Sequence, residues 1–120
     1  MDIYREDILD HYENPRNMGE LVDPDYEGRD SNASCGDMIQ FQLKMEDEVI
    51  KEVKWKGIGC AITTAAASKL SEFLKGKTLS DLQKMSCEEI VEEGIGFKVN
   101  PGRMKCLTLP VRVFKKIWES

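Results

Sequence analysis

Three cysteines of this chain stand where a thiol can act as a metal ligand or as a nucleophile. Cys35 opens Cys35-Gly36-Asp37, which places a carboxylate two residues from a thiol at a glycine-containing bend. Cys60 follows Gly57-Ile58-Gly59 just before a helix-forming run, and Cys106 stands just before a second amphipathic run. A helix N-terminus favours negative charge and lowers the pKa of a thiol, and glycine allows a metal to approach the backbone. These positions favour thiolate chemistry if the fold gathers them.

The spacing alone leaves two interpretations open. Thiolates prefer zinc and iron–sulfur clusters over hard cations, and Asp37 could supply a fourth ligand beside three thiols. Alternatively, the cysteines are core residues, since cysteine is among the most buried residue types, and Asp37 is a turn carboxylate. No Cys-x-x-Cys pair is present, so an ordinary zinc finger is not expected. The fourth cysteine, Cys87, lies in a capping box between Ser86 and two glutamates that disfavour a thiolate, so we expect it to take no part.

Length and charge restrict the classes of function. The 120 residues suit a single domain over residues 1–120 with one modest core. The net charge of −5 argues against nucleic acid as a partner. No apolar stretch is long enough to cross a membrane, and the acidic start lacks the apolar core of a signal peptide. We therefore expect a cytoplasmic protein whose cysteines are reduced and serve as ligands or reactive thiols rather than disulfides.

The element that would position Asp37 and Cys60 is a β-hairpin. Residues 38–45 alternate apolar and polar side chains, as in a strand with one buried face. Residues 49–56 form a second such strand after the acidic turn at 46–48. The polar, proline-containing segment before Cys35 suits a loop with one weak strand over residues 26–30. A hairpin with a weak neighbouring strand is therefore expected.

Helical periodicity accounts for most of the remaining chain. We expect helices over residues 3–12, 62–74, 79–85 and 87–93, and a last helix that runs from Cys106 to the C-terminus. Pro110 would fall in the first turn of the last helix, where its missing N–H does the least harm. The only histidine, His11, is expected to be solvated on the polar face of the first helix.

A set of motifs recurs here in the order of a known family. They are His11-Tyr12-Glu13-Asn14-Pro15-Arg16-Asn17-Met18-Gly19, Cys35-Gly36-Asp37, Gly59-Cys60 with small residues after it, Lys75-Gly76-Lys77, and Arg103-Met104-Lys105-Cys106. Together they resemble the U-type iron–sulfur cluster assembly scaffolds, which comprise IscU, the N-terminal part of NifU, and SufU. The resemblance covers nearly the whole chain. It implies an α+β fold: a small three-stranded, mostly antiparallel sheet with helices packed on it and the metal site at one exposed end, in agreement with the elements above.

The resemblance also implies a function. It is that of a scaffold on which a [2Fe–2S] cluster is assembled from iron and from sulfur delivered by a cysteine desulfurase of the IscS/NifS type. The cluster then passes to apo iron–sulfur proteins or carrier proteins. The implied ligands are Cys35, Asp37, Cys60 and Cys106, and the carboxylate suits release because it is more exchangeable than a fourth thiolate. Such a protein is a carrier rather than an enzyme, and a cluster shared across a homodimer is compatible with an exposed site.

Two alternatives stay open because zinc and iron sites use the same ligands. One is a zinc-dependent sulfur acceptor or transferase of the SufU type, and the other is a zinc-stabilised interaction domain without transfer activity. The classical scaffolds carry histidine before the third cysteine, whereas this chain has Lys105, as the SufU branch does. Between Cys60 and Cys106, however, there is no room for the long SufU insertion. The Leu-Pro-Pro-Val-Lys motif that a dedicated Hsp70-type chaperone binds is replaced by residues 99–103, Val-Asn-Pro-Gly-Arg.

Two expectations concern the sulfur donor. Cys106 is expected to be the persulfide acceptor, because Lys105, Arg103 and the N-terminus of the following helix would lower the pKa of its thiol. Lys105 would act electrostatically, since a charged lysine has no free lone pair for a metal. The expected desulfurase-binding surface combines residues 94–105 with the N-terminal helix and turn, represented by Tyr4, His11, Tyr12, Asn14, Pro15 and Arg16.

Overall fold

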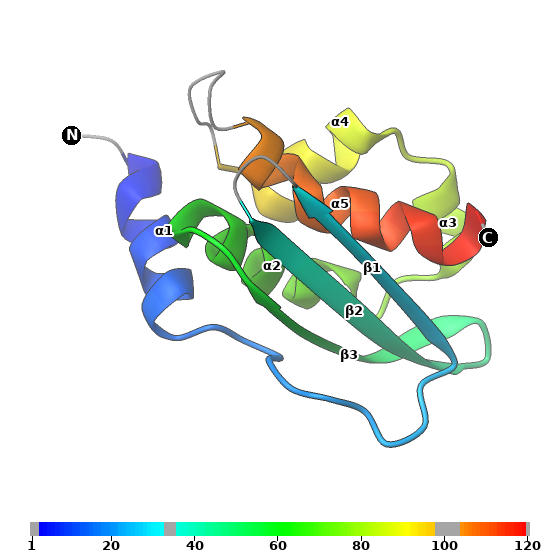
Figure 1. The fold of residues 1–120 in the computed structure, drawn as a ribbon. Coiled ribbons are helices and arrows are strands. Elements are labelled where there is room, and N and C mark those ends of the chain that lie inside the picture. Colours follow the sequence, from blue (N-terminus) through cyan, green and yellow to red (C-terminus); the bar gives the residue numbers. More distant parts are fainter. Residues whose placement is uncertain (1–2, 33–35, 98–103, 120) are drawn as a thin grey trace.

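The computed structural model describes residues 3–32, 36–97 and 104–119 (Figure 1). Cys35, the segment 98–103 and the side chain of Tyr4 lie outside this description. The elements are α1 (Ile3–Glu13), β1 (Tyr26–Asn32), β2 (Asp37–Glu46), β3 (Val49–Ile58), α2 (Ala61–Leu74), α3 (Leu79–Gln83), α4 (Cys87–Ile90), the π-helical turn η1 (Val91–Ile95) and α5 (Met104–Glu119). The α+β fold with one small sheet is therefore confirmed.

The sheet is antiparallel with the order β1-β2-β3, and β2 and β3 form the predicted hairpin. Phe41 pairs with Trp55 and Leu43 with Val53, so the alternating apolar residues of both strands share one buried face. The hairpin turns at Asp47 and Glu48, both of which have positive φ (53° and 67°). Two residues with positive φ form the kind of turn that suits the twist of a hairpin.

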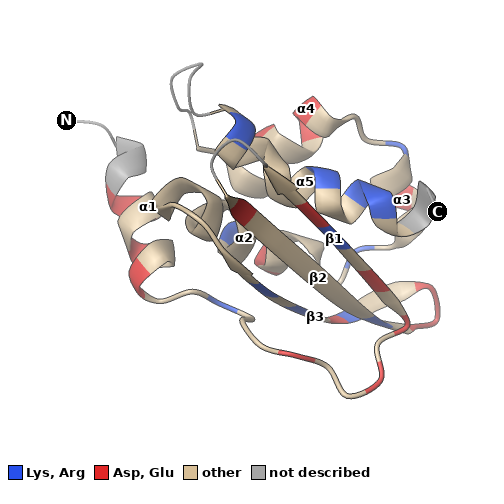
Figure 2. Ribbon diagram, viewed as in Figure 1, with Lys and Arg blue, Asp and Glu red and all other residues tan. Residues whose placement is uncertain are grey.

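The helices cover the buried face of the sheet, with α5 over β1 and β2, α2 over β3, and α1 beside α2 (Figure 1). Gly28 shows how closely α5 approaches, because a Cβ there would lie 2.7 Å from Cγ1 of Ile117. Lys116 and Arg112 of α5 also lie 3.3 Å and 3.8 Å from the Asp30 carboxylate of β1. Figure 2 shows blue (basic) stretches of α5 beside red (acidic) stretches of β1. Packing and charge together fix α5 across the sheet.

Two local predictions are corrected and one is confirmed. The last helix begins at Met104, so Cys106 lies in its first turn rather than before it. Pro110 therefore stands inside the helix, where its missing N–H removes the usual bond to the Cys106 carbonyl oxygen. The capping box at Ser86 is present as predicted, with Glu89 as its partner. Among the described helices, none is both long enough and apolar enough to span a membrane.

Candidate metal centre

Asp37, Cys60 and Cys106 come together at one end of the sheet. Asp37 begins β2, Cys60 is the N-cap of α2, and Cys106 lies in the first turn of α5. One potential ligand atom from each lies within 4.8 Å of the other two. Ligand atoms around a tetrahedral zinc ion are roughly 3.5–4 Å apart, so only a small contraction would be needed. Asp37 and Cys106 are 4% and 6% exposed, and Cys60 alone among the three is partly open to solvent.

The hairpin brings Asp37 and Cys60 together. The register of the hairpin pairs Met38 with Ile58. Asp37 directly precedes Met38, and Cys60 follows two residues after Ile58, so Asp37 and Cys60 meet at the open end of the hairpin. A Cβ on Gly57 would lie 2.1 Å from the Met38 carbonyl oxygen. A Cβ on Gly59 would lie 2.9 Å from Cβ of Thr63 and 3.2 Å from Oδ1 of Asp37. Both glycines are therefore required for the close approach of the strand end to the site.

Thr63 lies inside the group, and the sequence analysis missed it. Its buried hydroxyl donates a 2.9 Å hydrogen bond to Oδ2 of Asp37 and lies 3.5 Å from Sγ of Cys60. The signal that could have found it is its place three residues after an N-cap, where a side chain lies over the start of the helix. Asp37, 26 residues away, gave no local indication of the contact.

The two thiols differ in acidity. For Cys60, burial favours the neutral thiol and raises the pKa, but contacts with the Thr63 and Cys106 side chains and hydrogen bonds from the backbone N–H groups of Thr63 and Ile62 outweigh burial and lower the pKa. For Cys106, burial and then the hydrogen bond to Cys60 raise the pKa to about 11. The expected low pKa of the Cys106 thiol is therefore wrong.

Lys105 and Cys87 stand apart from the three donors. The Lys105 side chain is exposed, and its backbone carbonyl oxygen accepts a 3.1 Å hydrogen bond from the buried amide of Asn32. Asn32 also binds Arg112, so it fixes the end of β1 to the start of α5. Cys87 is exposed on α4 and is not a member of the group. Cys35, the remaining predicted ligand, lies outside the described residues, so the ligand set stays a prediction.

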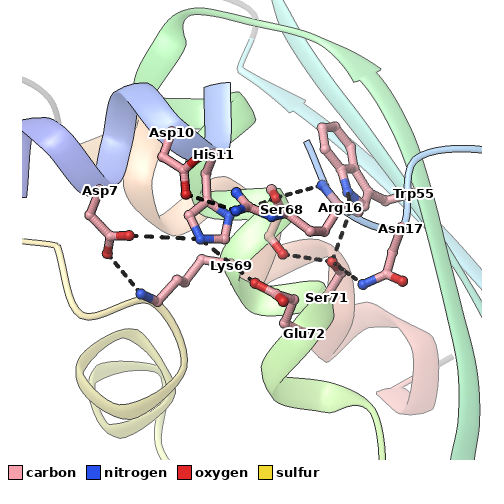
Figure 3. A network of polar contacts seen from close by, with 10 residues as sticks. All are labelled: Asp7, Asp10, His11, Arg16, Asn17, Trp55, Ser68, Lys69, Ser71 and Glu72. Carbon is pink, nitrogen blue, oxygen red and sulfur yellow. Dashed lines mark hydrogen bonds and ion pairs between the residues drawn. The ribbon is translucent and has the colours of Figure 1, made fainter. Parts of the chain in front are cut away.

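His11 is a buried residue, and the prediction that it is solvated is wrong (Figure 3). It is 4% exposed, and its Nδ1 lies 2.8 Å from Oγ of Ser68 on α2. The same hydroxyl accepts a 2.9 Å hydrogen bond from the backbone N–H of Arg16. The Arg16 carbonyl oxygen in turn accepts the indole N–H of Trp55 at 2.8 Å. His11 therefore fastens α1 and the following turn to α2 and β3 rather than facing a partner.

The acids near His11 are already paired. Asp7, Asp10 and His11 lie close enough to hold a metal ion in principle. However, Asp7 binds Lys69 at 2.7 Å and Asp10 binds Arg16 at 2.7 Å (Figure 3). We therefore interpret both carboxylates as structural ion-pair partners rather than as metal ligands.

Comparison with known proteins identifies the family. The model of the NifU-like N-terminal domain matches residues 3–117. The chain belongs to this family. The resemblance to U-type scaffolds that the motifs indicated is thereby confirmed.

Two relatives of this family differ in the function that their names give. The chain is 38% identical to the mitochondrial iron sulfur cluster assembly protein 1 of Debaryomyces hansenii, over 89% of this chain and 61% of that protein. It is 32% identical to the zinc-dependent sulfurtransferase SufU of Bacillus subtilis, over 95% of this chain and 88% of that protein. The chain thus spans about three fifths of the length of the yeast relative.

A solved structure shares the fold. It is a putative iron–sulfur cluster assembly scaffold protein for the SUF system from Fervidobacterium islandicum, with a TM-score of 0.80. The match covers 93% of each chain at 23% sequence identity. At that identity the likeness concerns the fold alone, and it agrees with the arrangement of sheet and helices described above.

Proposed function

We propose that this chain is a scaffold on which a [2Fe–2S] cluster is assembled from iron and desulfurase-derived sulfur, and then transferred to apo-proteins. The observation that carries the proposal is the convergence of Asp37, Cys60 and Cys106 from three separate elements. Two sulfur donors and one oxygen donor, largely shielded from water, fit iron–sulfur chemistry and zinc better than hard cations. Membership of the NifU-like family and a relative named as an iron sulfur cluster assembly protein support the same function.

Within this proposal, Cys35, Asp37, Cys60 and Cys106 hold the cluster. Cys35 stands two residues before Asp37 in the sequence, and the resemblance to the U-type scaffolds includes it in the ligand set. The three thiolates supply tight binding, and Asp37 supplies the weakest bond. Because a carboxylate exchanges more readily than a thiolate, the cluster is expected to leave by loss of the Asp37 contact first.

The first sulfur acceptor is a separate part of the proposal. If Cys106 is the persulfide acceptor, with electrostatic support from Lys105, its thiol must become more exposed, because the residue is only 6% exposed. Cys60 is partly exposed and has the lower pKa, so it is the more reactive of the two described thiols before metal binds. Mass spectrometry of the metal-free protein after reaction with desulfurase and cysteine distinguishes them. A persulfide mainly on Cys60 would refute the role of Cys106.

The main alternative is a zinc-dependent sulfur acceptor, and the name of the Bacillus relative, a zinc-dependent sulfurtransferase, supports it. The alignment with that relative spans 130 positions, more than the 120 residues of this chain, so the relative has residues where this chain has none. This difference tilts the choice toward the scaffold. Anaerobic purification, an absorption spectrum and metal analysis test it. Coloured protein with equal iron and sulfide supports the scaffold, whereas colourless protein with one zinc per chain supports the acceptor or a zinc-stabilised interaction domain.

The proposed partners are a cysteine desulfurase and apo iron–sulfur or carrier proteins, in the cytoplasm, where thiols stay reduced. The desulfurase surface needs revision because His11 is buried, so deleting the first helix would disturb the core. Tyr12, which is 47% exposed on the same helix, is the better probe. Tyr12→Ala should weaken desulfurase binding without lowering the melting temperature. Unchanged affinity would exclude α1 from the interface. Size-exclusion chromatography of loaded and unloaded protein tests for a homodimer.

A further inference from the structure

Thr63 lies among the expected ligands of the candidate metal centre, although it is not itself one of them. It is fully buried on the first turn of α2, three residues after Cys60. Its Oγ1 lies 2.9 Å from Oδ2 of Asp37 and 3.5 Å from Sγ of Cys60. The hydroxyl therefore contacts a donor from β2 and the donor that caps α2.

The direction of the hydrogen bond follows from the chemistry. An ionised carboxylate only accepts, so the single hydroxyl proton of Thr63 is given to Asp37. A hydrogen bond to a charged acceptor is roughly twice as strong as a neutral one, and the 2.9 Å contact is shorter than the 3.5 Å contact to sulfur. Asp37 is thus the main partner of the hydroxyl.

The Thr63 side chain is also held in one orientation. A β-branched side chain in a helix has few allowed rotamers. Gly59 lies against it so closely that a Cβ there would come within 2.9 Å of both Cβ and Cγ2 of Thr63. Packing therefore aims the hydroxyl at Asp37, and the hydrogen bond aims the carboxylate toward the two thiols.

We propose that Thr63 is the positioning residue of the metal centre, which holds the Asp37 carboxylate beside Cys60 and Cys106 before the metal arrives. The inference rests on the proposed metal site and adds a residue to it. Partners that orient a ligand in this way typically contribute about 10- to 100-fold to metal affinity, because without them the ligand must be ordered at the moment of binding.

The variant Thr63→Val tests the proposal, because valine keeps the branched shape and removes the hydroxyl. The probes are Co²⁺, whose thiolate charge-transfer and d–d absorption report the sulfur donors and the geometry, and Zn²⁺ in competition with it. In metal-free, reduced protein we expect Thr63→Val to bind both ions about 10- to 100-fold more weakly than wild type. Thr63→Ser retains the hydroxyl and should stay within about threefold of wild type.

Two controls separate positioning from a general structural effect. Thr64→Val makes the same chemical change at the next, half-buried residue of α2 and should leave the affinity unchanged. In an Asp37→Ala background, Thr63→Val should cost less than about threefold, because the group on which it acts is gone. A Thr63→Ala variant is measured in parallel, so that a folding defect specific to valine does not decide the result.

The outcomes are distinct. Equal affinities for Thr63→Val, Thr63→Ala and wild type would overturn the proposal, and so would an equal loss with and without Asp37. If wild type bound neither Co²⁺ nor Zn²⁺, the metal site itself would be refuted, and the role of Thr63 with it. The expected result is that Thr63→Val lowers the metal affinity, that Thr63→Ser keeps it near that of wild type, and that Thr63→Val has little effect in the Asp37→Ala background.

Discussion

Lowering the pH from 7.5 to 5.5 should destabilise the metal-free protein through His11. Burial and then the charge of Arg16 lower the pKa of its imidazole, while Asp7 and Glu72 oppose this effect and Lys69 adds to it. The two acids lie 3.8 Å and 3.6 Å from Nε2, yet Glu72 is half exposed to solvent and the partly buried Asp7 already binds Lys69. They therefore compensate only in part for the burial of a charged ring.

The sign and size of the effect follow from linkage. Above the ordinary pKa of 6.5 the ring is neutral in both states, and the stability contributed by His11 is fully present. Below that value the unfolded chain takes up a proton that the folded chain resists, so stability is lost as the pH falls toward the lowered pKa. One such group changes the free energy of unfolding by at most about 1.4 kcal/mol per pH unit. A loss of about 1 kcal/mol lowers the melting temperature by roughly 4 °C for a domain of this size.

Thermal unfolding by circular dichroism, at constant ionic strength with chelator and reductant, measures this effect. His11→Asn is the matched control, because its amide lies near the position of Nδ1 and can still bind Ser68 but does not titrate. Since the chain has a single histidine, the slope between pH 7.5 and 5.5 should be present in wild type and absent in the variant. A flat wild-type profile, or the same slope in His11→Asn, would refute the argument.

Four further predictions concern the thiols, the carboxylate and the hairpin. Replacing Cys35, Cys60 or Cys106 singly with serine should abolish stable cluster assembly, measured by absorption after anaerobic reconstitution, whereas Cys87→Ser should leave it nearly intact because Cys87 is exposed. A cluster lost in Cys87→Ser but kept in one of the other variants would contradict the ligand set. Asp37→Ala should lengthen the lifetime of the bound cluster in air and slow its transfer to an apo-ferredoxin, because the most exchangeable bond is gone; unchanged lifetime and rate would argue against Asp37 as a ligand. Alkylation of metal-free protein, followed by peptide mapping, should find Cys87 modified first, then Cys60, and Cys106 last, because Cys87 is the most exposed and the buried Cys106 has a raised pKa. Early modification of Cys106 would contradict the buried position of its thiol. Glu48→Gly should stabilise the fold by about 1 kcal/mol in urea unfolding, because glycine adopts the positive φ of this turn without a Cβ penalty; a lower stability would mean that the Glu48 side chain makes a contact worth more than that penalty.

The sequence predicted what local patterns determine. The hairpin followed from the alternation of apolar and polar residues within 38–45 and 49–56, and the closeness of Asp37 and Cys60 is a consequence of that hairpin. The capping box at Ser86 was found because both of its partners lie within four residues. These features depend on neighbours in the sequence, so a single chain is enough to reveal them.

Contacts between distant segments were the part that could not be predicted. His11 is buried because it meets Ser68, 57 residues away, and a polar helix face gives no sign of that partner. Thr63 likewise depends on Asp37. The acidity of Cys106 was predicted from its neighbours Lys105 and Arg103, whereas it is set by burial and by Cys60. In each case tertiary packing outweighed the local pattern.

The donors of the metal centre lie far apart along the chain, and this separation has a mechanical consequence. A cargo held by Asp37 and Cys106 closes a loop of about 70 residues, as a crosslink does. In the chain-entropy treatment of crosslinks, a loop of that length restricts the unfolded chain by about 4 kcal/mol at room temperature. A cluster bound as proposed would therefore crosslink the start of β2 to the start of α5. If the proposed transfer to a recipient removes the cluster, this crosslink is lost, and the chain without cluster should unfold more easily than the loaded chain.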